Sequence, residues 1–463
     1  MNTTGALPRI SDDPFFGSIL RYRKDRFAFL KSLAEGTEIV RARMGAFPIV
    51  LVTSPEIAHE ALVQKDVDFI KGFGLSLFGR PLLGNGLLTS EGVTHRRQRK
   101  LMAPAFVQKR IAEYATEISA RTEKAQRGWT DGVGVDVAEA MTHLTLEIVG
   151  KTLFDTEIGG DAAEIGEALT HAMEHIIGSL SSLVPIPPTW PTPRNHRNNQ
   201  AIARLDQIVY RLIREHREGG GDRGDFLSML LLAQDEDDGR GMTDKQVRDE
   251  AMTIVLAGHE TTANALSWTF YLLAQHPSIR ARLEHEVDAA LGGRSPSLAD
   301  LPKLPYALQV LKEAMRLYPP AYVFSRRPLH DVTLGGCAVP KGQMVLFNVA
   351  GMHRLARLYP EPHRFNPDRF TPAAEKALPR QAYMPFGAGS RVCIGNHFAL
   401  MEGQLVLAAL TQRLRFDPLP GAPHVDTESL VTLRPRGGLR MQVHRRAATA
   451  HESAPRLQDA LEG

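Results

Sequence analysis

The residues best suited to chemistry lie in two short segments, one around Cys393 and the other around Glu260. Cys393 stands in the string FGAGSRVCIG, directly before a helix predicted to begin near Gly395. Backbone N–H groups at the start of a helix favour a negative charge, so this position favours a thiolate. The glycines of the string would let the backbone pass close to a flat ligand.

A thiolate in this place can bind the iron of a haem, where it pushes electron density toward bound dioxygen and promotes O–O cleavage. Arg391, two residues earlier, could reach a propionate of the same haem. A free cysteine is more commonly a small buried apolar side chain. The spacing of the whole string argues against that interpretation for Cys393, whereas Cys337, in a predicted turn, is expected to be inert.

The string around Cys393 resembles the cysteine-ligand signature of the cytochrome P-450 family. The matching positions are Phe386, Gly387, Gly389, Arg391, Cys393 and Gly395. The resemblance implies that Cys393 is the thiolate ligand of a haem b iron, and that Phe386 and Arg391 also bind this cofactor.

The second segment is AGHETT, residues 257–262, within a long predicted helix. Glu260 and Thr261 resemble the catalytic acid–alcohol pair of the family, with Gly258 letting the helix open beside oxygen. A mid-helix hydroxyl can bond back to the carbonyl four residues earlier, and a carboxylate can exchange protons with water, so the pair suits a proton relay. The alternative is that Thr261 and Thr262 only satisfy backbone groups. We expect His259 to be a packing residue.

Haem propionates need cations. His95 and Arg99 are four residues apart and therefore share a helix face. They resemble the family's propionate-binding element, and Arg326 matches the position of another propionate arginine, with Arg327 beside it as a competitor. The alternative interpretation of each cation is a solvated surface charge.

A structural brace is predicted near the cysteine loop. Glu313 and Arg316 are three apart in a helix and can pair directly. Arg369, in FNPDRF, could bind the same carboxylate or nearby carbonyls. The three residues resemble the family's Glu-x-x-Arg and Pro-x-Arg-Phe elements, which brace the fold and take no part in catalysis.

The region after His95 is basic and has two open interpretations. It is either a docking face for an acidic electron donor, since opposite charges raise encounter rates, or an ordinary charged helix face. Its cations are Arg96, Arg97, Lys100, Lys109 and Arg110.

Helical patterns dominate the elements that must position these residues. A hairpin is predicted over 38–52, a helix capped by Ser54 follows it, and 69–92 is expected to be a long irregular loop. A small β-rich part is predicted over 321–349. The predicted helices span 93–127 with a break at Pro104, 137–153, 162–183, 199–218, 243–275 with Thr243 as its N-terminal cap, 278–291, 306–318 and 395–414.

Composition excludes several classes of protein. The 463 residues carry a formal net charge of +3, which gives no general attraction to nucleic acid. Two cysteines cannot build a disulfide framework and fit a reducing compartment. The N-terminus shows neither a signal peptide nor an apolar membrane anchor, so we expect a soluble cytoplasmic protein.

The resemblance covers nearly the whole chain and implies a mainly α fold, a triangular helical prism with small β-sheets around one buried haem. We expect a single domain over residues 1–443, with a helix-rich and a small β-rich lobe, followed by a polar tail over 444–463. The implied reaction inserts one oxygen atom from O2 into a substrate. Electrons would come from NAD(P)H through a separate ferredoxin or flavodoxin with its reductase, and we expect a monomer.

The substrate is expected to be an apolar small molecule, because apolar side chains fill the 69–92 loop and the helix before VPIPPTWPTP. A fatty acid, terpenoid, steroid or polyketide would fit. The alternatives are a peroxygenase that uses hydrogen peroxide and a haem-based ligand sensor without turnover. A hydrolase with Cys393 as nucleophile and His397 as base lacks any motif for an oxyanion hole.

Overall fold

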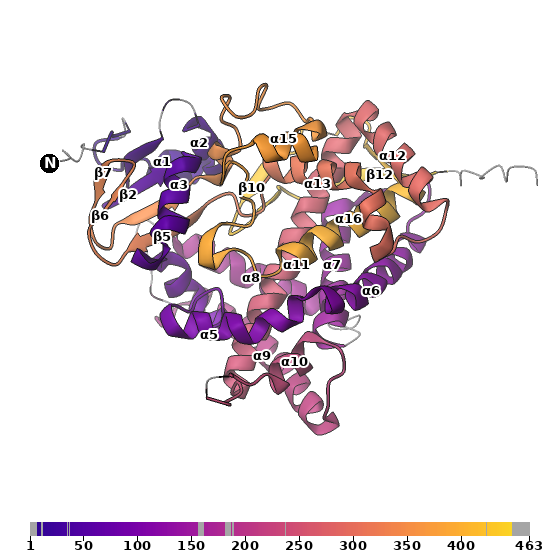
Figure 1. The fold of residues 1–463 in the computed structure, drawn as a ribbon, viewed down its shortest axis with the longest axis horizontal. Coiled ribbons are helices and arrows are strands. Elements are labelled where there is room, and N and C mark those ends of the chain that lie inside the picture. The colour runs from indigo at the N-terminus through magenta and orange to yellow at the C-terminus, as the bar shows by residue number, and fades with distance from the viewer. Residues whose placement is uncertain are drawn as a thin grey trace, which may run out of the picture.

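The computed structural model describes residues 7–10, 13–34, 36, 38–155, 162–180, 187, 189–236, 238–422 and 424–446. Figure 1 shows a broad triangular outline, in which helices make up most of the body and the strands of the N-terminal part lie at one side. This arrangement confirms the predicted mainly α fold with small sheets.

The longest helix, α11 (Asp244–Gln275), runs through the middle of the molecule (Figure 1). The hydroxyl of Thr243 accepts from the N–H of Gln246, and the Gln246 side chain accepts from the N–H of Thr243, so the first turn is capped as predicted. Nearly all its side chains beyond the first turn are buried, because other helices cover it on several sides. These neighbours are α7 (Val137–Phe154), α9 (Pro193–Gly219), α13 (Pro305–Leu317) and α16 (Asn396–Arg413).

The largest sheet contains the predicted hairpin. Strands β1 (Ile39–Met44) and β2 (Phe47–Val52) pair antiparallel, which confirms that prediction. Strand β8 (Met344–Phe347) lies parallel to β2, and β5 (Phe324–Pro328) and β3 (Phe69–Lys71) complete the order β1-β2-β8-β5-β3. The pairing of β3 with β5 sets residues from two distant parts of the chain side by side.

The segment 69–92 is not the irregular loop that its composition indicates. It begins with β3, continues through a π-helical turn over Leu75–Gly79 into α4 (Arg80–Leu83), and ends at the start of α5 (Gly92–Met102). Leu82 and Leu83 are almost fully buried. The apolar side chains therefore order the segment by packing into the core, which overrides the turn preference of its glycines.

Two small sheets near the C-terminus were not predicted. Strand β12 (Arg440–Arg445) pairs with β9 (Leu414–Pro418) and with β4 (Gly134–Asp136), and β10 (Thr427–Ser429) pairs with β11 (Leu433–Pro435). Strand β12 continues through His444 and Arg445 into the segment expected as the tail. The rest of that segment, 447–463, lies outside the described residues.

The other long helices follow the predicted pattern, with a difference at the start of one of them. Helix α9 begins six residues before the predicted 199, because Thr192 caps its first turn and Pro193 fits there. The remaining elements are α1 (Ile19–Lys24), α2 (Arg26–Ser32), α3 (Pro55–His59), α6 (Gln108–Arg127), α8 (Ala162–Leu180), α10 (Phe226–Leu232), α12 (Pro277–Leu291), β6 (Val332–Leu334), β7 (Cys337–Val339), α14 (Val349–Met352) and α15 (Pro372–Ala377). The short helices α1, α2, α10, α14 and α15 were not predicted.

The predicted brace is formed. Glu313 and Arg316 are fully buried and pair through two hydrogen bonds of 2.6 and 2.8 Å. Arg369 approaches the same carboxylate at 3.4 Å, and Arg316 also donates to the carbonyl oxygen of His353 at 2.8 Å. The His353 ring accepts from the N–H of Met384 at 2.9 Å. The brace therefore reaches the segment that leads into the cysteine loop.

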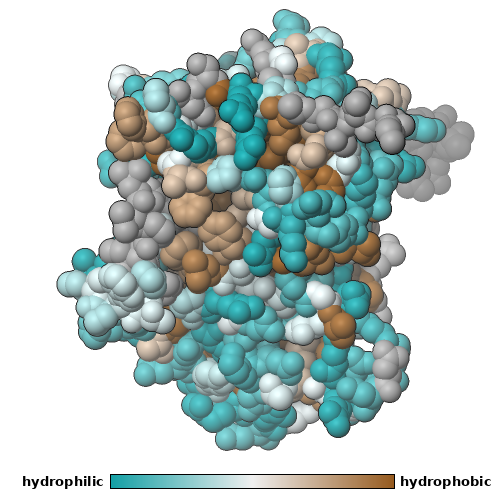
Figure 2. All heavy atoms as spheres, turned by 90° about the vertical axis from the view of Figure 1, so that its left-hand side faces the viewer, coloured by the Kyte–Doolittle hydropathy of each residue, from teal (hydrophilic) through white to brown (hydrophobic). Residues whose placement is uncertain are grey.

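The surface carries apolar side chains as well as charged ones. Figure 2 views the molecule from the side of the N-terminal strands and shows hydrophobic side chains gathered in its upper part, with mostly hydrophilic ones below. Phe15 and Phe47, both from the N-terminal part, are 84% and 57% exposed. Among the described residues, no helix combines the length and the apolar composition needed to cross a membrane.

Candidate active site

The loop before Cys393 owes its course to two glycines. Gly387 and Gly389 have φ angles of 73° and 72°, in the left-handed region that other residues rarely adopt. A Cβ on Gly389 would lie 1.8 Å from the carbonyl oxygen of Leu62. The N–H of Cys393 donates to the carbonyl oxygen of Phe386 at 2.9 Å, which closes the loop.

The Cys393 thiol meets opposing influences. Burial raises its pKa, whereas the backbone N–H of Gly395 and the charge of Arg99 lower it, and the net shift is upward. The predicted contacts that favour a thiolate are thus present, and burial outweighs them in the chain without its metal. Coordination would reverse the balance, because a thiol bound to a metal ion loses its proton.

Cys393 and the middle of α11 are both solvent-accessible within otherwise buried surroundings, and the region that they border is called the recess. Protein surrounds the thiol closely enough to raise its pKa, and yet Cys393 is solvent-accessible. On α11, Ala257 is exposed and Thr261 partly exposed, although the helix on either side of them is buried. Ile394, next to the cysteine, packs against the same apolar cluster as Val255 of α11. The cysteine loop and the AGHETT turn therefore border one region.

The acid–alcohol pair lies on this accessible stretch of α11. Thr261 donates from Oγ1 to the carbonyl oxygen of Ala257 at 2.6 Å, which confirms the predicted back-bond. Glu260 has a partner that sequence reasoning missed: the Thr432 hydroxyl donates to its Oε1 at 2.6 Å, and Asn264 donates to that hydroxyl at 3.2 Å. Thr432 lies 172 residues further along the chain and belongs to no motif, so no signal marks it.

Two neighbours of the pair have packing roles. His259 is buried and its Nδ1 lies 2.7 Å from the carbonyl oxygen of Val255, which confirms the prediction that it packs. A Cβ on Gly258 would lie 3.2 Å from Val149 of α7. A glycine at this place therefore lets α7 and α11 approach closely.

The cations predicted to bind propionates gather beside the cysteine loop. Arg99 donates from Nη1 to the carbonyl oxygen of Val392 at 2.8 Å. Burial lowers the pKa of His95 to about 4, and the charges of Lys71 and Arg391 add to the effect. The His95 ring is therefore neutral at pH 7 and can serve as a hydrogen-bond donor but not as a charge.

Lys71 is a further cation of this group that sequence reasoning missed. Lys71 lies directly opposite Arg326 in the antiparallel register of β3 and β5. Burial is the main cause that lowers the pKa of Lys71 to about 8 and that of Arg326 to about 10, and the charge of Arg391 lowers both. Lys71 also donates to the carbonyl oxygens of Leu87 and Ser90 at 2.8 and 2.7 Å. Its only sequence signal is a charge within a short apolar strand.

Arg391 joins the group through carboxylates. Its Nη1 donates to Asp66 at 2.8 Å, and its Nη2 donates to Glu91 and to the carbonyl oxygen of Phe69, both at 3.0 Å. Its Nε is buried and has no hydrogen-bond partner. Direct contact of Arg391 with a propionate thus stays a prediction, for which Nε is the unused donor.

The charge balance of this group fits a dianionic ligand. Lys71, Arg99, Arg326 and Arg391 lie near the carboxylates of Asp66 and Glu91, and burial raises the pKa of the nearby Glu250 to about 8. An excess of positive charge therefore stays in a largely buried place at pH 7. Buried like charges repel one another unless an anion joins them. Two propionates would supply two negative charges beside an accessible thiol, so these residues fit a haem b.

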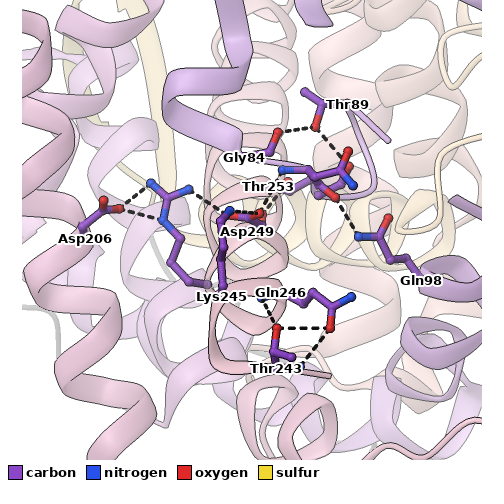
Figure 3. A network of polar contacts seen from close by, with 12 residues as sticks. Gly84, Thr89, Gln98, Asp206, Thr243, Lys245, Gln246, Asp249 and Thr253 are labelled. Carbon is purple, nitrogen blue, oxygen red and sulfur yellow. Dashed lines mark hydrogen bonds and ion pairs between the residues drawn. The ribbon is translucent and has the colours of Figure 1, made fainter. Parts of the chain in front are cut away.

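A polar network holds α11 against its neighbours (Figure 3). Asp249 accepts from the N–H of Asn85 at 2.9 Å and from Arg248 at 3.1 Å, and Arg248 also binds Asp206 of α9. A Cβ on Gly84 would lie 2.0 Å from the Asp249 carboxylate. The loop that leads to α5, and with it His95, is thereby positioned against α11.

The basic region after His95 is largely neutralised by the chain itself. Arg97 pairs with Asp235 at 2.8 Å and with Asp238 at 3.2 Å, and Lys100 pairs with Glu236 at 2.9 Å. The side chain of Lys109 lies outside the described residues. These pairs favour the interpretation as an ordinary charged helix face.

The site has the features of a haem-thiolate protein. These are an accessible cysteine at the end of a glycine-containing loop, a helix with an acid–alcohol pair, and a group of cations. The sequence matches the family model "Cytochrome P-450" over residues 8–441, and the chain belongs to the cytochrome P-450 family.

Curated relatives from Streptomyces agree with this assignment. Cyclooctatin synthase of Streptomyces melanosporofaciens is 39% identical over 88% of this chain and 89% of its own. Cyclooctat-9-en-7-ol 5-monooxygenase of the same organism is 38% identical over 90% and 91%. Pentalenene oxygenase of Streptomyces avermitilis is 34% identical over 88% and 91%. The predicted enzyme class, a monooxygenase of an apolar small molecule, is confirmed.

Proposed function

We propose that this enzyme oxygenates a terpenoid. The support is an apolar cluster beside the recess together with the names of the relatives, two of which specify cyclooctat-9-en-7-ol and pentalenene. The cluster unites the two segments expected to line the substrate site with α11. Its members include Phe78, Leu82, Leu83, Leu169, Met173, Ile176, Val255 and Leu256. Burial of apolar surface would be the main source of substrate affinity.

The residues of the recess take complementary roles in this proposal. Cys393 binds the haem iron, and Phe386 of the cysteine loop contacts the cofactor. The propionate side is held by Lys71, His95, Arg99, Arg326 and Arg391. When bound, the haem supplies the activation of dioxygen. Glu260 and Thr261 deliver protons from the α11 side, because their side chains lie on the accessible stretch of a buried helix.

Electrons come from NAD(P)H through a ferredoxin or flavodoxin and its reductase. The acid–alcohol pair favours this route over use of hydrogen peroxide, because a relay that carries protons to oxygen is needed when oxygen is reduced stepwise. Product formation with each oxidant system distinguishes the two routes. The proposal requires that product forms under air with NADPH, a ferredoxin and its reductase. If product forms with hydrogen peroxide but not with this NADPH system, the enzyme is a peroxygenase.

The haem ligand is tested by the absorption spectrum of the reduced protein under CO. The wild type and Cys337→Ala should both show the red-shifted Soret band of thiolate ligation. Cys393→Ala should lose it. A band typical of histidine ligation in the wild type would refute the assignment of Cys393.

The substrate class is tested by optical titration with pentalenene, cyclooctat-9-en-7-ol and palmitate. A terpenoid enzyme should show a low-spin to high-spin shift with at least one of the first two, and turnover to an oxygenated product. A shift with palmitate alone would exclude the terpenoid proposal. Spectral binding without turnover of any of them would favour a ligand sensor.

A further inference from the structure

The carboxylate of Glu260 is held by a residue of the C-terminal hairpin. Thr432 lies between β10 and β11, is 6% exposed, and donates from Oγ1 to Glu260 Oε1 at 2.6 Å. We propose that Thr432 is a positioning residue for the proton relay, and that the hairpin tip links the position of Glu260 to occupancy of the apolar recess. This inference rests on the monooxygenase function proposed above.

The bond has a defined direction. A hydroxyl has one proton to donate, and Asn264, one helical turn after Glu260, occupies an acceptor site of the same hydroxyl at 3.2 Å. The Thr432 proton is therefore committed to the carboxylate. Hydrogen bonds to an ionised acceptor are shorter and stronger than neutral ones, which fits the 2.6 Å separation.

Leu430 and Leu433, on either side of the hairpin tip, are anchored independently of Glu260. Trp268 of α11 donates from Nε1 to the carbonyl oxygen of Leu433 at 3.1 Å, and the N–H of Leu433 donates to Pro320 at 3.0 Å. The Tyr322 hydroxyl donates to the carbonyl oxygen of Leu430 at 2.7 Å. Thr432 thus presents its hydroxyl from a fixed support, which is what a positioning role needs.

The tip also reaches the apolar cluster. Val431, directly before Thr432, packs against the cluster that includes Leu256 and Ile176. Arg434 on the far side of the tip lies 3.5 Å from Glu174 of α8. A substrate that contacts Val431 would displace Thr432 between its two anchored neighbours, and with it the carboxylate of Glu260.

The bond also separates the two members of the acid–alcohol pair. Neighbouring residues of a helix do not face each other, since each is turned by about 100° from the last. In this structure Glu260 points to Thr432, while Thr261 bonds back to Ala257. Substrate at the tip would move Thr432 together with the carboxylate that it holds, so the position of Glu260 for proton delivery would follow substrate binding.

Three variants test the positioning role. Thr432→Val keeps the shape and loses the hydroxyl, Thr432→Ser restores it, and Glu260→Gln removes the acceptor charge. With pentalenene as probe, Thr432→Val should shift the partition between product and peroxide by roughly tenfold toward peroxide, the equivalent of one charge-assisted hydrogen bond. Thr432→Ser should restore the wild-type partition. In Glu260→Gln, adding Thr432→Val should change nothing further.

An infrared readout is independent of turnover. The carboxylate band of Glu260, assigned by its loss in Glu260→Gln, should shift in Thr432→Val and stay in place in Thr432→Ser. Pentalenene should shift the same band in the wild type but not in Val431→Ala. An unchanged carboxylate band in Thr432→Val would overturn the positioning role. So would an increase in peroxide that is as large when Thr432→Val is added to Glu260→Gln as when it is made in the wild type. An insensitive wild-type band would overturn the link to occupancy, whereas absence of product with normal band shifts would count against the monooxygenase function alone.

Discussion

Arg316 and Glu313 form a two-bond ion pair that is completely removed from solvent, with side-chain exposures of 0%. The pair joins α13 to the segment 353–362, which precedes the cysteine loop, because Arg316 also donates to the carbonyl oxygens of His353 and Pro362, each at 2.8 Å. Removing one member would leave the other charge buried without its partner. That cost is larger than the net contribution of the intact pair.

Arg316→Met should therefore lower the free energy of unfolding by about 3–5 kcal/mol. The matched control is Arg364→Met, since Arg364 pairs with Glu361 at the same spacing on the surface, where exposures are 65% and 69%. An exposed pair contributes at most about 1 kcal/mol. Denaturant unfolding measures both, and similar losses in the two variants would contradict the bracing role.

The two glycines of the cysteine loop should differ in their tolerance of alanine. Both have φ near +72°, so alanine strains the backbone by roughly 1–2 kcal/mol at either place. Only Gly389 has a backbone atom in the way, the Leu62 carbonyl oxygen at 1.8 Å; no atom lies within 4 Å of a Cβ at Gly387. Gly389→Ala should lose the thiolate-type CO spectrum, and Gly387→Ala should keep it. Equal spectra would show that the loop can move away from Leu62.

The lowered pKa of Lys71 predicts that the free energy of unfolding of the chain without haem depends on pH. Its pKa in the folded chain is about 8, below the value of about 10.4 expected when unfolded. Between these values the unfolded chain binds more protons, so stability rises with pH across that window, by an amount on the order of 3 kcal/mol. The difference between wild type and Lys71→Met in denaturant melts at pH 7 and pH 10.5 isolates this contribution. A flat difference would exclude it.

Lys71 should also slow the loss of haem from the protein. Transfer of haem to apomyoglobin should be faster in Lys71→Met than in wild type, because one of the positive charges facing the propionates is lost. Lys341→Met, on an exposed turn, is the control and should not change the rate. Unchanged transfer in both variants would remove Lys71 from the propionate group.

The hydroxyl of Thr261 is expected to serve proton delivery and not helix stability. Thr261→Ala should divert NADPH-derived electrons to peroxide, with reduced product per NADPH. Thr269 makes the same bond to the carbonyl four residues earlier, at 2.7 Å to Ala265, but is fully buried away from the recess. Thr269→Ala should keep coupling intact. Equal uncoupling in both variants would trace the effect to the helix and not to the relay.

Most of the secondary structure could be predicted from local sequence patterns. Helix caps such as Thr243, the hairpin over 38–52 and the Glu313–Arg316 spacing depend on neighbours within a few residues, so the residue types alone are informative. The same patterns failed over 69–92, where glycines indicate a loop but burial of Leu82 and Leu83 orders the segment. The local preference there is weaker than the free energy of packing.

The sequence by itself determined the family and predicted the cysteine ligand and the acid–alcohol pair, because each depends on a short string of fixed spacing. Only the tertiary structure decided which distant groups meet these residues. Thr432 binds Glu260 and two carboxylates bind Arg391 because chain segments separated by 172 and 300 residues or more pack together. Such contacts follow from the burial of whole helices and strands, and a single residue type at a distant position does not reveal them.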